Sequence, residues 1–342
     1  MSGSGTQIFD SLSQVDQLAI LQDCATLALG HYTIGAAPRA RLVNLSENAT
    51  YAIEGGDRRY ALRIHREGYH SPRAIASELA WMVALREAGV VITPRPVWNS
   101  QGAYITRIGH PALLMPRSVV LFDWETGAEP GIGDDLGQPF EKLGAVTARM
   151  HAHARGWTRP TDFSRPVWNF ETALGDAAPH WGSWRDGIGV TPAHIALFGR
   201  TVEAIGRRLA AFGSGPDRFG LVHCDLRLAN LLIDGPVVKA IDFDDCGFSW
   251  FMYDAATPVS FYEDDTKVPD LIDAWVRGYR SEAPLIAADA AEIPTFVMLR
   301  RLLLVAWIGS HPETELARSM GVRYTDGTTG LCETYLSRFA ET

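Results

Sequence analysis

The chain contains the stretch HCDLRLAN at residues 223–230 and the stretch IDFDDCG at residues 241–247. Between them, two apolar runs flank an Asp-Gly pair, a pattern typical of a short β-hairpin with a tight turn. Because a hairpin reverses the chain, we expect Asn230 and Asp242 to emerge side by side at its open end. An amide oxygen and a carboxylate suit a hard divalent cation such as Mg²⁺, with Asp225 close enough to act on a substrate. Together the two stretches predict an arrangement suited to phosphoryl transfer.

Composition places the chain among soluble globular proteins. Its 342 residues are enough for two domains, and 46% of them are hydrophobic and 21% charged. The net charge of −9 and the isoelectric point near 5.6 argue against a nucleic-acid-binding surface. No apolar run approaches the roughly 20 residues of a membrane span, and the N-terminus lacks a basic start and an apolar core. We therefore predict a cytoplasmic protein that binds neither membranes nor nucleic acids.

The cysteines indicate the redox state of the chain, and the positions of the lysines exclude one kind of nucleotide site. The four cysteines are far apart and form no CxxC pair, which predicts reduced thiols packed in the interior. Because Cys224 and Cys246 lie beside the two stretches above, a redox or metal role stays open for them. The chain has no Gly-Lys-Ser or Gly-Lys-Thr sequence, and this excludes a P-loop nucleotide site.

The N-terminal third has the pattern of a small mixed domain. A first helix is expected within residues 1–35, ending at Gly30, and a second begins at Ser71-Pro72, an N-cap followed by proline, and ends at Gly89. Alternating apolar residues predict five antiparallel strands, at residues 41–45, 50–54, 58–65, 103–108 and 112–122.

The remainder of the chain is mainly helical. Residues 127–137 are expected to form a loop, and 157–192 are loop-rich with several tryptophans. Helices are predicted at residues 140–155, 201–212, 268–279, 287–308 and 330–339. The order predicts an α+β chain with an N-terminal lobe at 1–121, a hinge at 122–127 and a helical lobe at 128–342.

These features resemble the aminoglycoside phosphotransferase and choline kinase family, which has the protein-kinase-like two-lobe fold. The family's catalytic motif His-x-Asp-x-x-x-x-Asn is matched by His223, Asp225 and Asn230, and its metal-binding segment by residues 241–247. The resemblance extends over residues 38–310. Within the family, the chain is similar to the bacterial branch with homoserine-kinase-like and stress-response-kinase-like members. It implies ATP as the nucleotide co-substrate and Mg²⁺ as the metal ion.

The resemblance also implies roles for the residues of the two stretches. Asp225 would accept or orient the proton of the attacking hydroxyl, and Asn230 and Asp242 would bind Mg²⁺. Arg227 would reach the γ-phosphate in the transition state, with a surface salt bridge as the alternative. His223 is expected to hold the loop backbone.

Other polar residues near the two stretches have less definite predictions. Asp254 resembles a buttress that holds the catalytic loop, and a plain N-cap is the alternative. For Asp244 and Asp245 the alternatives are a second metal site and a solvated acidic loop. His151 and His153 diverge around a helix, so we interpret them as core or interface histidines rather than metal ligands.

The nucleotide is expected to contact the N-terminal lobe. Arg63 occupies the place of the family's strand-three lysine and would contact the α- and β-phosphates, with Glu78 as its ion-pair partner. Ala61, on the same face of the strand, would lie against the adenine. Ser46 and Asn48 belong to a loop that stands in place of a glycine-rich loop. The backbone N–H groups of this loop and the Asn48 side chain would cover the phosphates. A bare hairpin turn is the alternative.

The predicted hinge and the acceptor site are less specific. Backbone groups at Asp123, Trp124 and Glu125 would contact the adenine edge. Aromatic and acidic residues within 157–192, 250–265 and 287–308 suit an amine-bearing alcohol, although a tryptophan-rich core is the alternative.

The acceptor therefore stays open. We predict a small-molecule hydroxyl, borne by an amino alcohol, an aminoglycoside or a choline-like amine. A stress-response-type Ser/Thr protein kinase and a nucleotide-binding pseudokinase are the alternatives, and the oligomeric state is not predicted.

Overall fold

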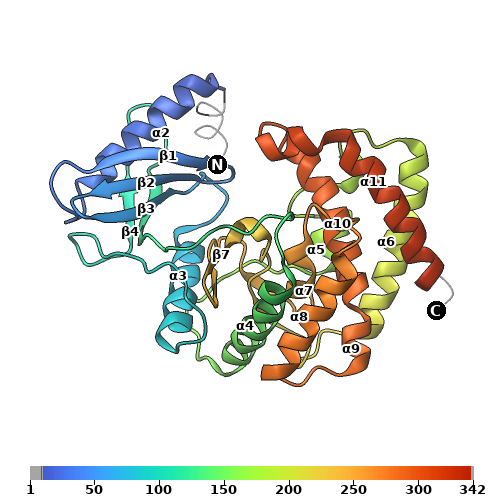
Figure 1. The fold of residues 1–342 in the computed structure, drawn as a ribbon. Coiled ribbons are helices and arrows are strands. Elements are labelled where there is room, and N and C mark those ends of the chain that lie inside the picture. Colours follow the sequence, from blue (N-terminus) through green and yellow to red (C-terminus); the bar gives the residue numbers. More distant parts are fainter. Residues whose placement is uncertain (1–8, 10, 340–342) are drawn as a thin grey trace. The chain divides into compact units, whose positions relative to one another are not determined.

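The computed structural model describes residues 9 and 11–339, and the chain divides into two compact units. Unit 1 consists of the segment up to Ala88 together with Thr93–Thr126 and Arg159–Ser164. Unit 2 consists of Gly89–Ile92, Gly127–Thr158 and the segment from Arg165 onward. Figure 1 labels the elements of both units.

Unit 1 is built on a five-stranded antiparallel sheet with the strand order β1-β2-β3-β5-β4. The five predicted strands are confirmed. Their bounds are β1 (Arg39–Leu45), β2 (Ala49–Gly55), β3 (Arg58–Ile64), β4 (Ile105–Ile108) and β5 (Arg117–Asp123).

The first helix, α2 (Gln14–Leu29), covers one face of this sheet (Figure 1). Its buried side chains form one core cluster with Tyr60, Leu62 and Ile64 of β3. The helix begins after Ser13, whose hydroxyl accepts the amide hydrogen of Asp16, and it ends at Gly30 as expected.

The second helix of unit 1 is α3 (Pro72–Glu87), whose N-cap is Ser71 as predicted. Two predicted strands begin later than expected, β4 at Ile105 rather than at residue 103 and β5 at Arg117 rather than at residue 112. Before β5 the chain makes a turn at His110, whose carbonyl oxygen accepts from the amide of Leu113. That turn takes residues 111–113 out of the sheet.

Unit 2 is mainly helical. Its strands form two separate pairs, β6 (Phe219–Val222) with β9 (Gly247–Trp250), and β7 (Leu231–Asp234) with β8 (Val237–Ala240). The β7–β8 pair is the predicted hairpin, whereas the β6–β9 pair was not predicted. The helices of eight or more residues are α4 (Gly137–Gly156), α6 (Pro192–Phe212), α8 (Val268–Glu282), α10 (Ile293–Ser310) and α11 (Glu315–Phe339).

Three helices differ most from their predicted bounds. Helix α6 begins at Pro192 rather than at residue 201, because Thr191 forms a capping box with His194. The helix expected at 287–308 is two helices, α9 (Ala287–Ala291) and α10, which meet at Glu292. Helix α11 begins well before residue 330 and is kinked at Gly321.

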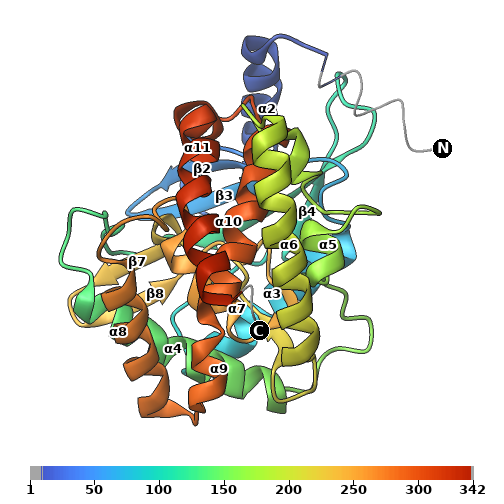
Figure 2. The same cartoon turned by 90° about the vertical axis from the view of Figure 1, so that its right-hand side faces the viewer.

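Helix α10 is the central helix of unit 2. It runs beside α6 and α11 in both views (Figures 1 and 2), and most of its residues are buried. The stretch 287–310 is long and apolar enough to cross a membrane by length and composition, contrary to the expectation that no such run exists. However, 83% of its most apolar window is buried inside the protein, as in the core helix of a soluble protein.

Helices α4 and α8 pack together through glycines. A Cβ atom at Gly278 would overlap the carbonyl oxygen of Glu141, and one at Gly144 would overlap that of Trp275. The two backbones can approach this closely only because neither position carries a side chain.

We therefore predict that Gly278→Ala lowers the free energy of unfolding by about 3 kcal/mol, because the added methyl group forces the helices apart. Gly330→Ala is the matched control, since Gly330 lies in α11 with no atom within 4 Å of the new Cβ. Alanine there should stabilise the helix by up to about 1 kcal/mol. Urea unfolding of both variants measures the difference, and equal stabilities would contradict the proposed close contact.

Candidate active site

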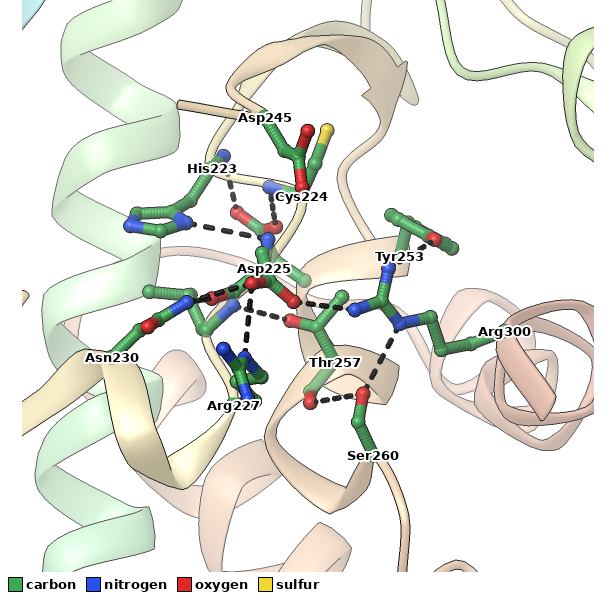
Figure 3. Close-up of polar contacts among 12 residues, drawn as sticks. His223, Cys224, Asp225, Arg227, Asn230, Asp245, Tyr253, Thr257, Ser260 and Arg300 are labelled. Carbon is green, nitrogen blue, oxygen red and sulfur yellow. Dashed lines mark hydrogen bonds and ion pairs between the residues drawn. The ribbon is translucent and has the colours of Figure 1, made fainter. Parts of the chain in front are cut away.

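The residues 223–230 form the loop between β6 and β7 (Figure 3). Cys224 has a left-handed backbone conformation with φ of 68°, which is uncommon for a residue other than glycine. The short 3-10 helix η2 (Leu228–Asn230) then leads into β7. The loop thereby turns the Asp225 side chain toward residues from several other segments of unit 2.

Asp225 accepts hydrogen bonds at both of its carboxylate oxygens (Figure 3). Its Oδ2 accepts from Asn230 Nδ2 at 2.7 Å and from Arg227 Nε at 3.3 Å. Its Oδ1 accepts from a terminal nitrogen of Arg300. Of the predicted site residues, Asp225, Arg227 and Asn230 are therefore brought together.

The charges around Asp225 keep it ionised. Burial acts to raise the pKa of its carboxyl group, but the guanidinium groups of Arg300 and Arg227 outweigh burial and lower the pKa below its usual value. An ionised carboxylate at this position can accept the hydrogen of a substrate hydroxyl.

Arg300 is the residue that the sequence prediction missed. It lies in α10, 75 positions after Asp225, and its side chain is 3% exposed. The available signal was the pair Arg300-Arg301 in the middle of an otherwise apolar helix, because buried arginines require partners.

Asn230 and Asp242 emerge at the same end of the hairpin, as predicted. Leu231 pairs with Ala240, and the amide of Ile241 donates to the carbonyl oxygen of Asn230 at 2.9 Å. Asp242 is exposed and has a left-handed backbone with φ of 57°.

The donor set is compatible with Mg²⁺. Because Asn230 Nδ2 donates to Asp225, its Oδ1 is the atom that can ligate a cation. Among residues 9 and 11–339, no three His, Cys, Asp or Glu side chains gather as a metal site. Mg²⁺ is usually bound by one or two protein groups and takes its other ligands from phosphates and water.

Asp254 holds the backbone of the loop 223–230, so it is a buttress and not an N-cap. Its two carboxylate oxygens accept the amide hydrogens of His223 at 3.0 Å and Cys224 at 2.8 Å. In the same segment, the hydroxyl of Thr257 accepts from the amide of Leu226 at 3.0 Å. Three loop amides are thereby fixed from one short stretch.

Two buried histidines complete this support. His223 Nδ1 accepts from the amide of Asp225 at 3.3 Å, and its Nε2 donates to the carbonyl oxygen of Ile241 at 3.1 Å. His223 therefore ties the loop to the segment before Asp242, the backbone role that was expected. His151 donates to Asp254 at 3.2 Å, which explains why this predicted core histidine is fully buried.

Burial lowers the pKa of both His151 and His223, although carboxylates beside each of them act in the opposite direction. Both rings are therefore neutral in the folded protein near neutral pH. His153 is partly buried and stacks on Trp157, as a core histidine would.

The acids after Asp242 are not a fully solvated loop. Asp244 is 6% exposed and its carbonyl oxygen accepts from Arg165, which also donates to the carbonyl oxygen of Cys246 at 2.6 Å. The carbonyl oxygen of Asp245 accepts from the indole of Trp168 at 2.9 Å. The alternative of a solvated loop is therefore wrong for Asp244. Cys246 and Cys224 are reduced and buried, as are the other two cysteines.

In unit 1, Arg63 and Glu78 form the expected ion pair. Arg63 on β3 donates to Glu78 on α3 at 2.6 Å, and the Glu78 side chain is fully buried. Ala61 is half-buried and pairs with Ala52 and Phe122 across the sheet.

The turn between β1 and β2 is held by its own backbone and by Asn48. The amide of Ser46 donates to the carbonyl oxygen of Asn48 at 3.1 Å. The side-chain oxygen of Asn48 accepts from the amide of Arg66 at 3.1 Å, which ties the turn to the end of β3. Its side chain thus has a structural contact that the sequence did not predict.

The predicted hinge residues all have partners within unit 1. Asp123 pairs with Arg58 at 2.9 Å, Glu125 pairs with Arg86 at 2.6 Å, and the guanidinium of Arg59 lies 3.5 Å from the ring centre of Trp124. The amides of Asp123 and Trp124 also donate to backbone carbonyl oxygens.

Most candidate acceptor residues lie in the core of unit 2. Trp168, Trp184, Trp250 and Trp307 are buried, and Glu263 is held by Arg301 at 2.6 Å and by Tyr324 at 2.9 Å. The ring centre of Trp181 lies 5.4 Å from the guanidinium carbon of Arg300. The alternative of a tryptophan-rich core therefore describes these residues.

Comparison with known proteins gives consistent matches. The model of the phosphotransferase enzyme family matches residues 40–289. The solved structure of a microcompartment-associated aminopropanol kinase is 44% identical, with a TM-score of 0.85 over 94% of this chain and 98% of that one. Amicoumacin kinase of Bacillus subtilis (strain 168) is 25% identical over 278 residues, 78% of each chain.

A second solved structure is an amicoumacin kinase in complex with AMP-PNP, Ca²⁺ and Ami. It is 24% identical, with a TM-score of 0.75 over 95% of this chain and 96% of that one. At this identity the likeness shows a common fold.

The buried histidines predict how stability depends on pH. A histidine whose pKa is lowered by folding binds fewer protons in the folded state than in the unfolded state, so stability falls as pH drops below about 6.5. His151→Gln should remove up to about 1.4 kcal/mol per pH unit of this dependence, because glutamine can still donate to Asp254 but does not titrate.

The measurement is urea unfolding between pH 7.5 and pH 5.5. His180→Gln serves as the control, because that ring is exposed. An unchanged pH dependence in His151→Gln would show that folding does not lower the pKa of His151.

Proposed function

Because the chain belongs to the phosphotransferase enzyme family, we propose that it transfers the γ-phosphate of ATP to the hydroxyl group of a small amino alcohol. The family and the protein-kinase-like fold class expected from the sequence are confirmed, and the chain is a small-molecule kinase. The amino alcohol is supported above all by the 44% identity with the aminopropanol kinase, which extends over nearly all of both chains.

In the proposed reaction, Asp225 acts on the acceptor. Its ionised carboxylate accepts the hydrogen of the acceptor hydroxyl and orients the oxygen toward the γ-phosphorus. The new bond joins that oxygen to phosphorus, the bond between phosphorus and the β–γ bridging oxygen breaks, and ADP leaves with the bonding electrons. The hydroxyl proton passes to Asp225.

Asn230 and Asp242 would hold Mg²⁺ through Asn230 Oδ1 and the Asp242 carboxylate. When bound, the ion offsets the negative charge of the ATP phosphates. The left-handed backbone of Asp242 supports this role, because such conformations in residues other than glycine concentrate at functional sites. Arg227 would assist at the γ-phosphate, since its guanidinium already lies at Asp225 Oδ2.

Unit 1 would bind the nucleotide. The ion pair with Glu78 orients the guanidinium of Arg63, and an arginine fork suits the α- and β-phosphates in place of lysine. The turn would add phosphate contacts through the Asn48 amide, because the Ser46 amide already donates to the carbonyl oxygen of Asn48. Ala61 and the segment Asp123–Glu125 would contact the adenine. The amides of Asp123 and Trp124 already have backbone partners, so carbonyl oxygens are the better candidates in that segment.

The test is transfer of labelled phosphate from ATP to a panel of acceptors: 1-amino-2-propanol, homoserine, choline, an aminoglycoside and a generic Ser/Thr protein substrate. We expect 1-amino-2-propanol to have the largest kcat/KM. Asp225→Asn should lower kcat by about 100-fold or more, because the neutral amide cannot accept the proton. Transfer to the protein substrate alone would support a Ser/Thr protein kinase instead.

One control variant and one variant of the metal site make the result specific. Asp273→Asn, an exposed acid in α8, should keep the wild-type kcat. Asp242→Asn should weaken the response of the rate to Mg²⁺, and an unchanged Mg²⁺ titration would contradict its assignment as a ligand. ATP binding without any phosphate transfer by the wild type would identify a pseudokinase.

A further inference from the structure

The hydrogen bonds of Asp225 leave a specific place for an acceptor hydroxyl. An ionised carboxylate has about four acceptor positions, two on each oxygen. Oδ2 uses both of its positions, for Asn230 and for Arg227. Oδ1 uses one, for Arg300. The remaining position is therefore on Oδ1, next to the guanidinium of Arg300.

The guanidinium of Arg300 is itself held at all three nitrogens (Figure 3). Its Nε donates to the hydroxyl of Ser260 at 3.1 Å, and one terminal nitrogen donates to the hydroxyl of Tyr253 at 3.2 Å. The other terminal nitrogen donates to Asp225. Because the fork is planar and rigid, three separate acceptors determine its orientation completely.

The partners of Arg300 belong to the segment that also holds the loop backbone. Tyr253 precedes Asp254, and Ser260 donates to the carbonyl oxygen of Thr257 at 2.7 Å. Asp254 and Thr257 accept the loop amides. One segment, residues 253–260, thus orients both the backbone and the carboxylate of Asp225.

The neighbouring Arg301 shows what a purely structural arginine does in the same helix. It is equally buried, but its guanidinium contacts Glu263, Thr328 and the carbonyl oxygen of Tyr324. None of these contacts involves the loop 223–230. Two adjacent arginines in α10 therefore differ in whether they reach Asp225.

We propose that Arg300 is a positioning residue for phosphoryl transfer, which holds the Asp225 carboxylate so that the open position on Oδ1 receives the acceptor hydroxyl. The inference rests on the proposed function, and it adds a residue from outside the stretches 223–230 and 241–247. Arg300 acts through Asp225, so its loss should impair turnover more than the binding of ATP.

The test compares Arg300→Lys with Arg301→Lys. Both variants keep a positive charge in α10, and only the first loses the fork that contacts Asp225. A small misplacement of a reacting group can cost up to about 100-fold in rate. We expect kcat to fall by about 10- to 100-fold in Arg300→Lys, with KM for ATP within about twofold of wild type. Arg301→Lys should keep the wild-type kcat.

Chemical rescue separates positioning from folding. Arg300→Ala removes the guanidinium and leaves space for a free one, so millimolar guanidinium chloride should restore part of its kcat. The same salt should not change kcat of the wild type or of Arg301→Lys. Thermal unfolding of each variant, recorded under assay conditions, shows what fraction is folded.

Three results would overturn the proposal. They are a wild-type kcat in Arg300→Lys, equal losses of kcat in Arg300→Lys and Arg301→Lys, and a loss in Arg300→Ala that follows the unfolded fraction and is not rescued. If the wild type phosphorylates a different hydroxyl, only the acceptor assignment fails. Arg300→Lys and Arg301→Lys are then compared with that acceptor as the substrate. A wild type with no Mg²⁺-dependent turnover would overturn both proposals.

Discussion

The ion pair between Asp225 and Arg300 is the interaction on which the rest of the site depends. A carboxylate that is almost fully buried stays ionised only if a nearby positive charge replaces the water that it has lost. Arg300 supplies that charge from α10, and in return Asp225 is the acid that neutralises Arg300. The two groups are therefore buried together, and neither is expected to remain in place alone.

Around this pair, the fold uses few residues for several tasks. Residues 253–260 accept the loop amides through Asp254 and Thr257 and orient Arg300 through Tyr253 and Ser260. Because the same segment supports both backbone and charge, a change in the site will usually alter stability as well as activity. Replacing Asp225 illustrates this, since it removes the proposed base and also leaves Arg300 buried without its acid.

The features predicted correctly are those that depend on residues close to one another in the sequence. The hairpin at Asp234-Gly235 determines where Asn230 and Asp242 emerge, and alternating residues determine the five strands of unit 1. Arg300 and the buttressing role of His151 were not predicted, because their partners lie 75 and 103 positions away and no local periodicity records such contacts. The early start of α6 could have been predicted from Thr191-Pro192, an N-cap followed by proline.

The coupling between Asp225 and Arg300 is best measured with a double-mutant cycle of unfolding free energies. The variants are Asp225→Ala, Arg300→Met and the two combined. Asp225→Ala alone should destabilise the protein by about 3–5 kcal/mol, because it leaves a buried charge unpaired. Adding Arg300→Met should recover much of that loss. If the two effects instead add within about 0.5 kcal/mol, the residues are not coupled, and the account of the site is wrong.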